Sequence, residues 1–111
     1  MPDERATRLA ENEARFREIN DRVERDLERL QYSPDELLPF VCECAQRTCS
    51  ATIELSRNDY ERVRGESTLF AVAPGHEITD IEDVLERHER YFLIRKHPET
   101  WEIVKASDPR R

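Results

Sequence analysis

The stretch FVCECAQRTCSATIEL, residues 40–55, contains all three cysteines of the chain, Cys42, Cys44 and Cys49. Because three is an odd number, these cysteines cannot all pair with one another in disulfides. Residues two apart in an extended segment point to the same face, so Cys42 and Cys44 present their thiols to one side. A disulfide between such close neighbours would be strained. The spacing therefore favours a metal site, with Cys49 a turn away as a third ligand.

A structural zinc ion usually takes four protein ligands, so a fourth ligand must come from another part of the chain. His76, in APGHEI, follows a predicted strand and lies in a Pro-Gly loop that can bend toward the cysteines. His88 lies in a charged segment and His97 precedes a proline in a predicted turn, and either is an alternative fourth ligand. A further alternative is that the thiols are only small buried apolar groups. We predict a Cys3His zinc site of Cys42, Cys44, Cys49 and His76.

The composition restricts the classes of protein that fit this chain. It has 111 residues, enough for one domain, and a net charge of −7. Neither half is basic, so there is no cationic surface for phosphates and nucleic-acid binding is unlikely on charge grounds. No apolar run reaches membrane-spanning length, and the charged first residues predict no secretory signal. We expect a cytoplasmic protein, in which thiols stay reduced.

Residues 4–30 have apolar side chains at helical spacing and contain no glycine or proline. This pattern predicts one amphipathic helix. The apolar stripe suits two arrangements equally: packing on the rest of the chain, or contact with a protein partner or a second copy. The members of the stripe are Leu9, Phe16, Ile19, Val23, Leu27 and Leu30.

The remainder of the chain alternates strand and helix signals. Capping boxes that begin at Ser56 and at Thr79, completed by Asp59 and Glu82, predict two short helices. The strands are predicted at 40–44, 51–55, 67–74, 90–96 and 101–106. The predicted fold class is α+β, with a long N-terminal helix, a small antiparallel sheet and two short helices. The predicted organisation is a helix at 1–30, a hinge at 31–39, a compact zinc-binding module at 40–106 and a flexible tail at 107–111.

Three segments within residues 38–96 carry a resemblance: FVCECAQRTCSATIELSRNDYERVR, FAVAPGHEI and VLERHERYFLI. They resemble a family of small uncharacterised actinobacterial proteins with a VCECxxxxC pattern, an IELT-type strand, a YExVR helix and a PGH loop. The resemblance implies that Cys42, Cys44, Cys49 and His76 are the matching site positions, and it implies no established activity. The family commonly has glycine after the CxC, where this chain has Ala45, which matters only if that turn needs a positive φ.

These observations predict a small zinc-stabilised binding or regulatory module for protein interaction. A closed Cys3His shell leaves no position for water or substrate, so the zinc is expected to be structural. The first alternative is a redox switch in which clustered thiolates are oxidised and release the metal. The second is an enzyme with a cysteine nucleophile and His76 as base, which requires a free thiol and no metal. Because the chain lacks G-x-S-x-G and H-E-x-x-H motifs, we expect no enzyme.

Overall fold

The computed structural model describes residues 4–110, so residues 1–3 of the predicted N-terminal helix and residue 111 of the predicted tail lie outside the described range. In chain order, the elements are α1 (Glu4–Arg29), β1 (Leu38–Val41), β2 (Thr52–Leu55), α2 (Arg57–Val63), β3 (Leu69–Val72), β4 (Glu82–Arg87), β5 (Phe92–Lys96), a 3-10 turn (Pro98–Thr100) and α3 (Trp101–Ala106). The predicted α+β class with a long N-terminal helix is confirmed.

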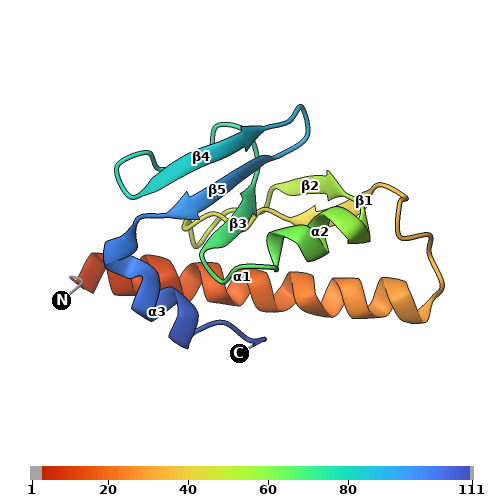
Figure 1. The fold of residues 1–111 in the computed structure, drawn as a ribbon, viewed down its shortest axis with the longest axis horizontal. Helices are drawn as coiled ribbons and strands as arrows, with labels where there is room; N and C mark the ends of the chain where they lie inside the picture. Colours follow the sequence, from red (N-terminus) through yellow and green to blue (C-terminus); the bar gives the residue numbers. More distant parts are fainter. Residues whose placement is uncertain (1–3, 111) are drawn as a thin grey trace.

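Two antiparallel sheets lie on one side of α1, which runs along the long axis of the molecule (Figure 1). One sheet pairs β1 with β2, and the other has the strand order β3-β5-β4. The short helix α2 leads from the first sheet to the second, and α3 packs near the N-terminal end of α1 (Figure 1). The single predicted sheet is therefore two separate sheets. Residues 42–51 join β1 to β2, and they also touch the second sheet, where the amide of Glu43 donates to the carbonyl of Ala71 in β3 at 2.9 Å.

The helix α1 docks on its own chain through a face that is largely polar. Phe16 is buried, and Val23 and Leu27 pack against the core, as an apolar stripe predicts. Ile19 and Leu30 are instead 43% and 64% exposed. Ala10 is also buried, and the other buried side chains of the docked face are polar: Glu13, Arg17, Asn20, Asp21 and Glu24.

Residues 82–87 form strand β4, so the helix predicted to begin at Thr79 is wrong. The capping-box acid Glu82 does accept a hydrogen bond from the backbone of Ile78 at 2.6 Å. Its other carboxylate oxygen accepts a bond from Lys96 of β5, and β4 pairs with β5 along its length. Pairing in the sheet outweighs the helix propensity of this charged segment, because propensity is a weak local preference.

Residues 101–106 form helix α3, so the strand predicted from WEIVKA is also wrong. Pro98 begins a 3-10 turn that continues directly into α3, a position where a fixed φ favours helix formation. The β-branched Ile103 and Val104, which suggested a strand, pack on the second core cluster from the helix. The structure thus has a helix where a strand was predicted, and a strand where the second short helix was predicted.

The strand β3 connects two apolar clusters and is buried on both faces. Leu69 and Ala71 belong to one cluster, which includes Phe40, Tyr60 and other residues of β1, β2 and α2. Phe70 and Val72 belong to the other, together with Cys42 and Cys44. Two of the three thiols are therefore part of the hydrophobic core.

A buried ion network connects α1, α2 and the C-terminal segment. Arg64 pairs with Asp21 at 3.0 Å and also with Asp108, and Arg17 pairs with Asp108 at 3.3 Å. The segment 31–37 is bonded to the start of α2, where Asn58 donates to the carbonyl of Pro34 at 3.1 Å. These contacts hold α1, the segment 31–37 and the segment after α3 against α2.

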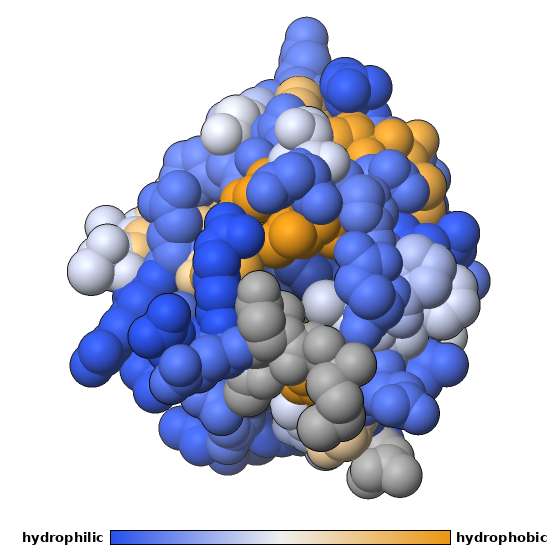
Figure 2. Space-filling model, turned by 90° about the vertical axis from the view of Figure 1, so that its left-hand side faces the viewer, coloured by the Kyte–Doolittle hydropathy of each residue, from blue (hydrophilic) through white to orange (hydrophobic). Residues whose placement is uncertain are grey.

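The surface is rich in charge. Seen from the end where the N-terminus and α3 lie, it is mostly hydrophilic, with smaller apolar areas between the polar side chains (Figure 2). Within residues 4–110, no helix has both the length and the apolar character needed to cross a membrane.

Candidate metal centre

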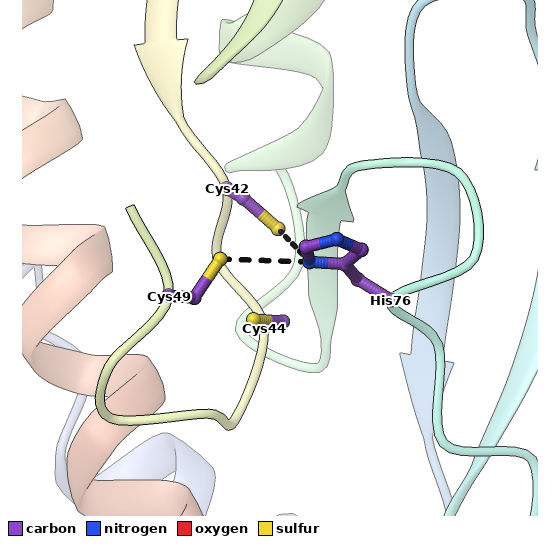
Figure 3. Close-up of side chains that lie close together, drawn as sticks. All are labelled: Cys42, Cys44, Cys49 and His76. Atoms are coloured by element: carbon purple, nitrogen blue, oxygen red, sulfur yellow. Dashed lines mark hydrogen bonds between the residues drawn. The ribbon is translucent and has the colours of Figure 1, made fainter. Parts of the chain in front are cut away.

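Two connections between strands bring the four predicted ligands together. Cys42 and Cys44 follow the end of β1, Cys49 lies in the turn that leads to β2, and His76 lies in the loop between β3 and β4. Their side chains converge on one point from both sheets (Figure 3). All four ligand atoms lie within 4.8 Å of one another. The structure therefore brings together the residues that the sequence suggested.

Two distances within the cluster match the edges of a small coordination shell. Nδ1 of His76 lies 3.6 Å from Sγ of Cys42 and 3.5 Å from Sγ of Cys49. With zinc bonds of about 2.3 Å to sulfur and about 2.0 Å to nitrogen, a tetrahedral shell has a sulfur–nitrogen edge of about 3.5 Å. The side chains can therefore hold one tetrahedral metal ion with little movement.

The site is buried on one side and accessible on the other. Cys42 and Cys44 are each 1% exposed, whereas Cys49 and His76 are half-buried. The thiols are also surrounded by backbone donors. The amide of Ala73 donates to Sγ of Cys42 at 3.1 Å. The backbone of Gln46 forms a hydrogen bond with Cys44, and that of Ala51 with Cys49. Such bonds favour thiolates, the form that binds metal.

The two buried thiols titrate as a pair. The hydrogen bond between them lowers the pKa of Cys44 to about 5, and it raises the pKa of Cys42, which burial also raises. Burial raises the pKa of Cys49. Because metal binds the thiolate form, a metal ion would displace the protons that the thiols carry.

Glu43, between the two buried cysteines, points away from the site. It is fully buried, and its carboxylate accepts hydrogen bonds from Tyr60 of α2 at 2.7 Å, Asn20 of α1 at 3.0 Å and the amide of Ala71 at 3.1 Å. The alternation of an extended chain explains both directions: Cys42 and Cys44 face the site and Glu43 faces the opposite side. Glu43 thus fixes the backbone that carries two ligands.

The loop that carries His76 needs the glycine before it. Gly75 has a φ of +89°, a region that other residues rarely adopt, and the amide of His76 closes the turn onto the carbonyl of Ala73 at 2.9 Å. Among the described residues, only Gly75 and Gln31 have a positive φ. Ala45 therefore adopts an ordinary conformation, and its turn does not require the glycine of the resembling family.

The other two histidines lie outside the cluster. His88 follows β4 on the surface, where it pairs with Glu86 at 2.7 Å and stacks on Tyr91. His97 precedes the 3-10 turn and pairs with Asp83 at 3.2 Å. Of the three candidates for a fourth ligand, the fold places only His76 beside the thiols.

Comparison with known proteins gave no further assignment. No family model, no curated protein and no solved structure matches the chain. The resemblance to the actinobacterial family therefore stays a prediction, and the site rests on its geometry.

The compactness of the cluster also restricts the kind of metal centre. A two-iron cluster needs room between its ligands for two irons and the sulfides that bridge them. Ligand atoms within 4.8 Å of one another leave space for a single ion. Three thiolates and an imidazole form a donor set typical of zinc.

The residues that support the candidate ligands are not among those predicted from the sequence. Glu43 was visible as an acid between two ligands, and alternation alone places it on the opposite face. Asn12 and Asn20 carry no sequence signal beyond being polar residues within a helical pattern. Their contacts with residues 41–45 depend on the tertiary docking of α1, which no local pattern predicts.

Proposed function

We propose that this protein is a small binding or regulatory module whose fold is stabilised by one structural zinc ion. The observation that supports it best is that the ligands come from both sheets. Cys42, Cys44 and Cys49 belong to the segment that joins β1 and β2, and His76 belongs to the β3–β4 loop. A metal bound by all four would cross-link two sheets that share no strand.

The donor set favours a structural role over a catalytic one. Catalytic zinc usually has three protein ligands and keeps the fourth position for water or substrate. Here four protein donors surround one point, and two of them are in the core. Zinc binding contributes about 10 kcal/mol or more to the folding of small zinc peptides, so the ion would stabilise this fold strongly. We propose no enzymatic activity.

Interaction with a protein partner or a second copy of the chain is the other part of the proposal. Four of the exposed large apolar side chains lie on the second half of α1 and the segment after it: Ile19, Leu30, Tyr32 and Leu37. This surface, rather than the docked residues Phe16, Val23 and Leu27, is available to a partner. Sedimentation of the protein against the Leu30→Glu variant tests the homodimer. A wild-type protein that stays monomeric at every concentration would exclude the homodimer.

Metal analysis of the purified full-length chain tests the zinc proposal. We expect about one zinc per chain by the stoichiometry of a four-ligand site, and a large fall in melting temperature when a chelator removes the metal. The Cys44→Ser variant should lose the metal, whereas Ser50→Ala, in the same loop but outside the cluster, should keep it. Metal-free protein with unchanged melting temperature after zinc addition would refute the proposal.

A redox switch is the second candidate, and the accessible side of the site favours it. Peroxide can oxidise two thiolates to one disulfide while it is reduced to two hydroxide ions, and the zinc leaves. Cys49 is half-buried and lies beside Cys42 and Cys44, so it is the thiol through which oxidation would begin. Treatment with mild peroxide, followed by measurement of released zinc, tests this role. Retention of both metal and fold would exclude it.

A further inference from the structure

The helix α1 makes direct polar contacts with the segment that carries the buried ligands. Asn20 donates to the carbonyl of Val41 at 2.8 Å and accepts from the amide of Val41 at 2.8 Å. It thereby pairs with the backbone of β1 as a neighbouring strand would. One turn before the helix centre, Asn12 donates to the carbonyl of Ala45 at 3.0 Å. The two asparagines therefore hold residues 41–45 at both ends.

These contacts account for the burial of Asn20. The side chain is fully buried, and a buried amide is costly unless its hydrogen bonds are made. Its remaining bond goes to Glu43 at 3.0 Å, so the two residues that its side chain contacts, Val41 and Glu43, both belong to the segment 41–45. Arg17, one turn earlier and also buried, supplies a positive charge that interacts with Glu43. The polar groups on the docked face of α1 thus complement the polar groups of this segment.

Within the proposed metal site, the segment 41–45 is the part whose movement these contacts restrict. Cys42 and Cys44 lie inside the 41–45 backbone, and both thiols are in the core. Ligands that are already in place when the metal arrives lose less conformational entropy on binding. Partners behind the ligands typically change metal affinity by about 10- to 100-fold when they are mutated.

We propose that α1 is the outer shell of the metal centre, with Asn12 and Asn20 as positioning residues that hold residues 41–45 for metal binding. This inference rests on the proposed zinc site and adds a role to the helix that composition and pattern do not assign. Because coupling is reciprocal, bound metal also stabilises the docking of α1. The site therefore requires residues 4–29 as well as the segment that contains its ligands.

Zinc affinity of the full-length chain, measured by competition with a chromophoric chelator, tests the proposal. Asn12→Ala removes one contact with the ligand segment and should weaken zinc binding by about 10- to 100-fold, the usual effect of losing an outer partner. Asn12→Gln keeps an amide donor and should recover part of the affinity. The matched control is Glu11→Ala, at the adjacent exposed position of α1, which should bind zinc as the wild type does.

Two further measurements separate positioning from general stability. A residue that only stabilises the fold would lower the free energy of unfolding without changing the zinc affinity of folded protein. A positioning residue should also alter the absorption of bound Co²⁺ used in place of zinc, because the ligand geometry changes. Wild-type affinity and an unchanged Co²⁺ spectrum in Asn12→Ala would overturn the inference. Failure of the wild type itself to bind zinc would instead refute the proposed function.

Discussion

The hydroxyl of Tyr60 donates a hydrogen bond of 2.7 Å to the carboxylate of Glu43, the residue between the two buried cysteines Cys42 and Cys44. Tyr60 comes from α2 and is fully buried, with its ring stacked on Phe40 of β1. Glu43 also accepts bonds from α1 and β3. A single buried carboxylate therefore connects the segment that carries Cys42 and Cys44 with the surrounding core.

Tyr60→Phe removes one of the three donors to this carboxylate and leaves the ring in place. We expect the free energy of unfolding to fall by about 2 kcal/mol, the usual range for a lost bond to a buried charged group. Chemical denaturation measures this change. Tyr32→Phe, at a residue that is 40% exposed, is the matched control and should have no effect. Equal stability of both variants would show that the Tyr60 bond contributes nothing.

His76→Ala should weaken zinc binding far more than His88→Ala. His76 faces the thiols at 3.5 and 3.6 Å, whereas His88 pairs with Glu86 on the surface. Loss of a direct ligand should cost more than the 10- to 100-fold typical of outer partners, so we expect a loss above about 100-fold. Competition with a chelator measures both variants. Similar affinities in the two variants would contradict the assignment of His76.

The order in which the thiols react should follow their exposure. When zinc is removed, a short pulse of iodoacetamide should label Cys49 first, because it is half-buried while Cys42 and Cys44 are each 1% exposed. We expect this order even though Cys44 has the lowered pKa, since a buried thiolate is out of reach of the reagent. Mass spectrometry of the peptides measures it. Equal labelling of all three thiols would contradict the prediction. Bound zinc should slow the labelling of every thiol.

Glu13 should make stability depend on pH. Burial raises the pKa of its carboxyl from 4.5 to about 7, although Lys96 at 2.9 Å opposes the shift. In the unfolded chain the group loses its proton near its ordinary pKa, while in the folded chain it keeps the proton until about pH 7. The folded state therefore binds more protons in this window, and stability falls as the pH rises from 4.5 to about 7.

Glu13→Gln should remove this slope, which for a shift of this size is on the order of 3 kcal/mol across the window. Unfolding is measured at a series of pH values with saturating zinc in every sample, because metal binding itself depends on pH. Glu18→Gln, at an exposed position of α1, is the control and should keep the wild-type slope. Parallel curves for Glu13→Gln and the wild type would contradict the assigned role of Glu13.

Local pattern was sufficient for the ligands and for some of the elements. The CxC spacing placed two thiols on one face, the Pro-Gly loop located His76, and Ser56 caps α2 by accepting a bond from the amide of Asp59, as the sequence suggested. These features depend on a few neighbouring residues, so physical rules for short segments describe them well.

The parts that the sequence did not predict depend on tertiary contacts. The segment at Glu82 has a helix-capping pattern, yet its carboxylate serves both the backbone of Ile78 and the buried Lys96 of the neighbouring strand. The polar docking face of α1 was not predicted either, because it too depends on tertiary contacts. Asn20 is an unremarkable helix residue until β1 lies beside it, and the apolar stripe drew attention to Ile19 and Leu30, which are exposed.

X-ray absorption at the zinc edge of the purified full-length chain tests the central claim most directly. We predict one bound zinc ion with three sulfur ligands at about 2.3 Å and one nitrogen ligand at about 2.0 Å, as the Cys42, Cys44, Cys49 and His76 cluster requires. The nitrogen contribution should disappear in His76→Ala and persist in His88→Ala. A shell of oxygen and nitrogen alone, or a second metal near the first, would contradict the account.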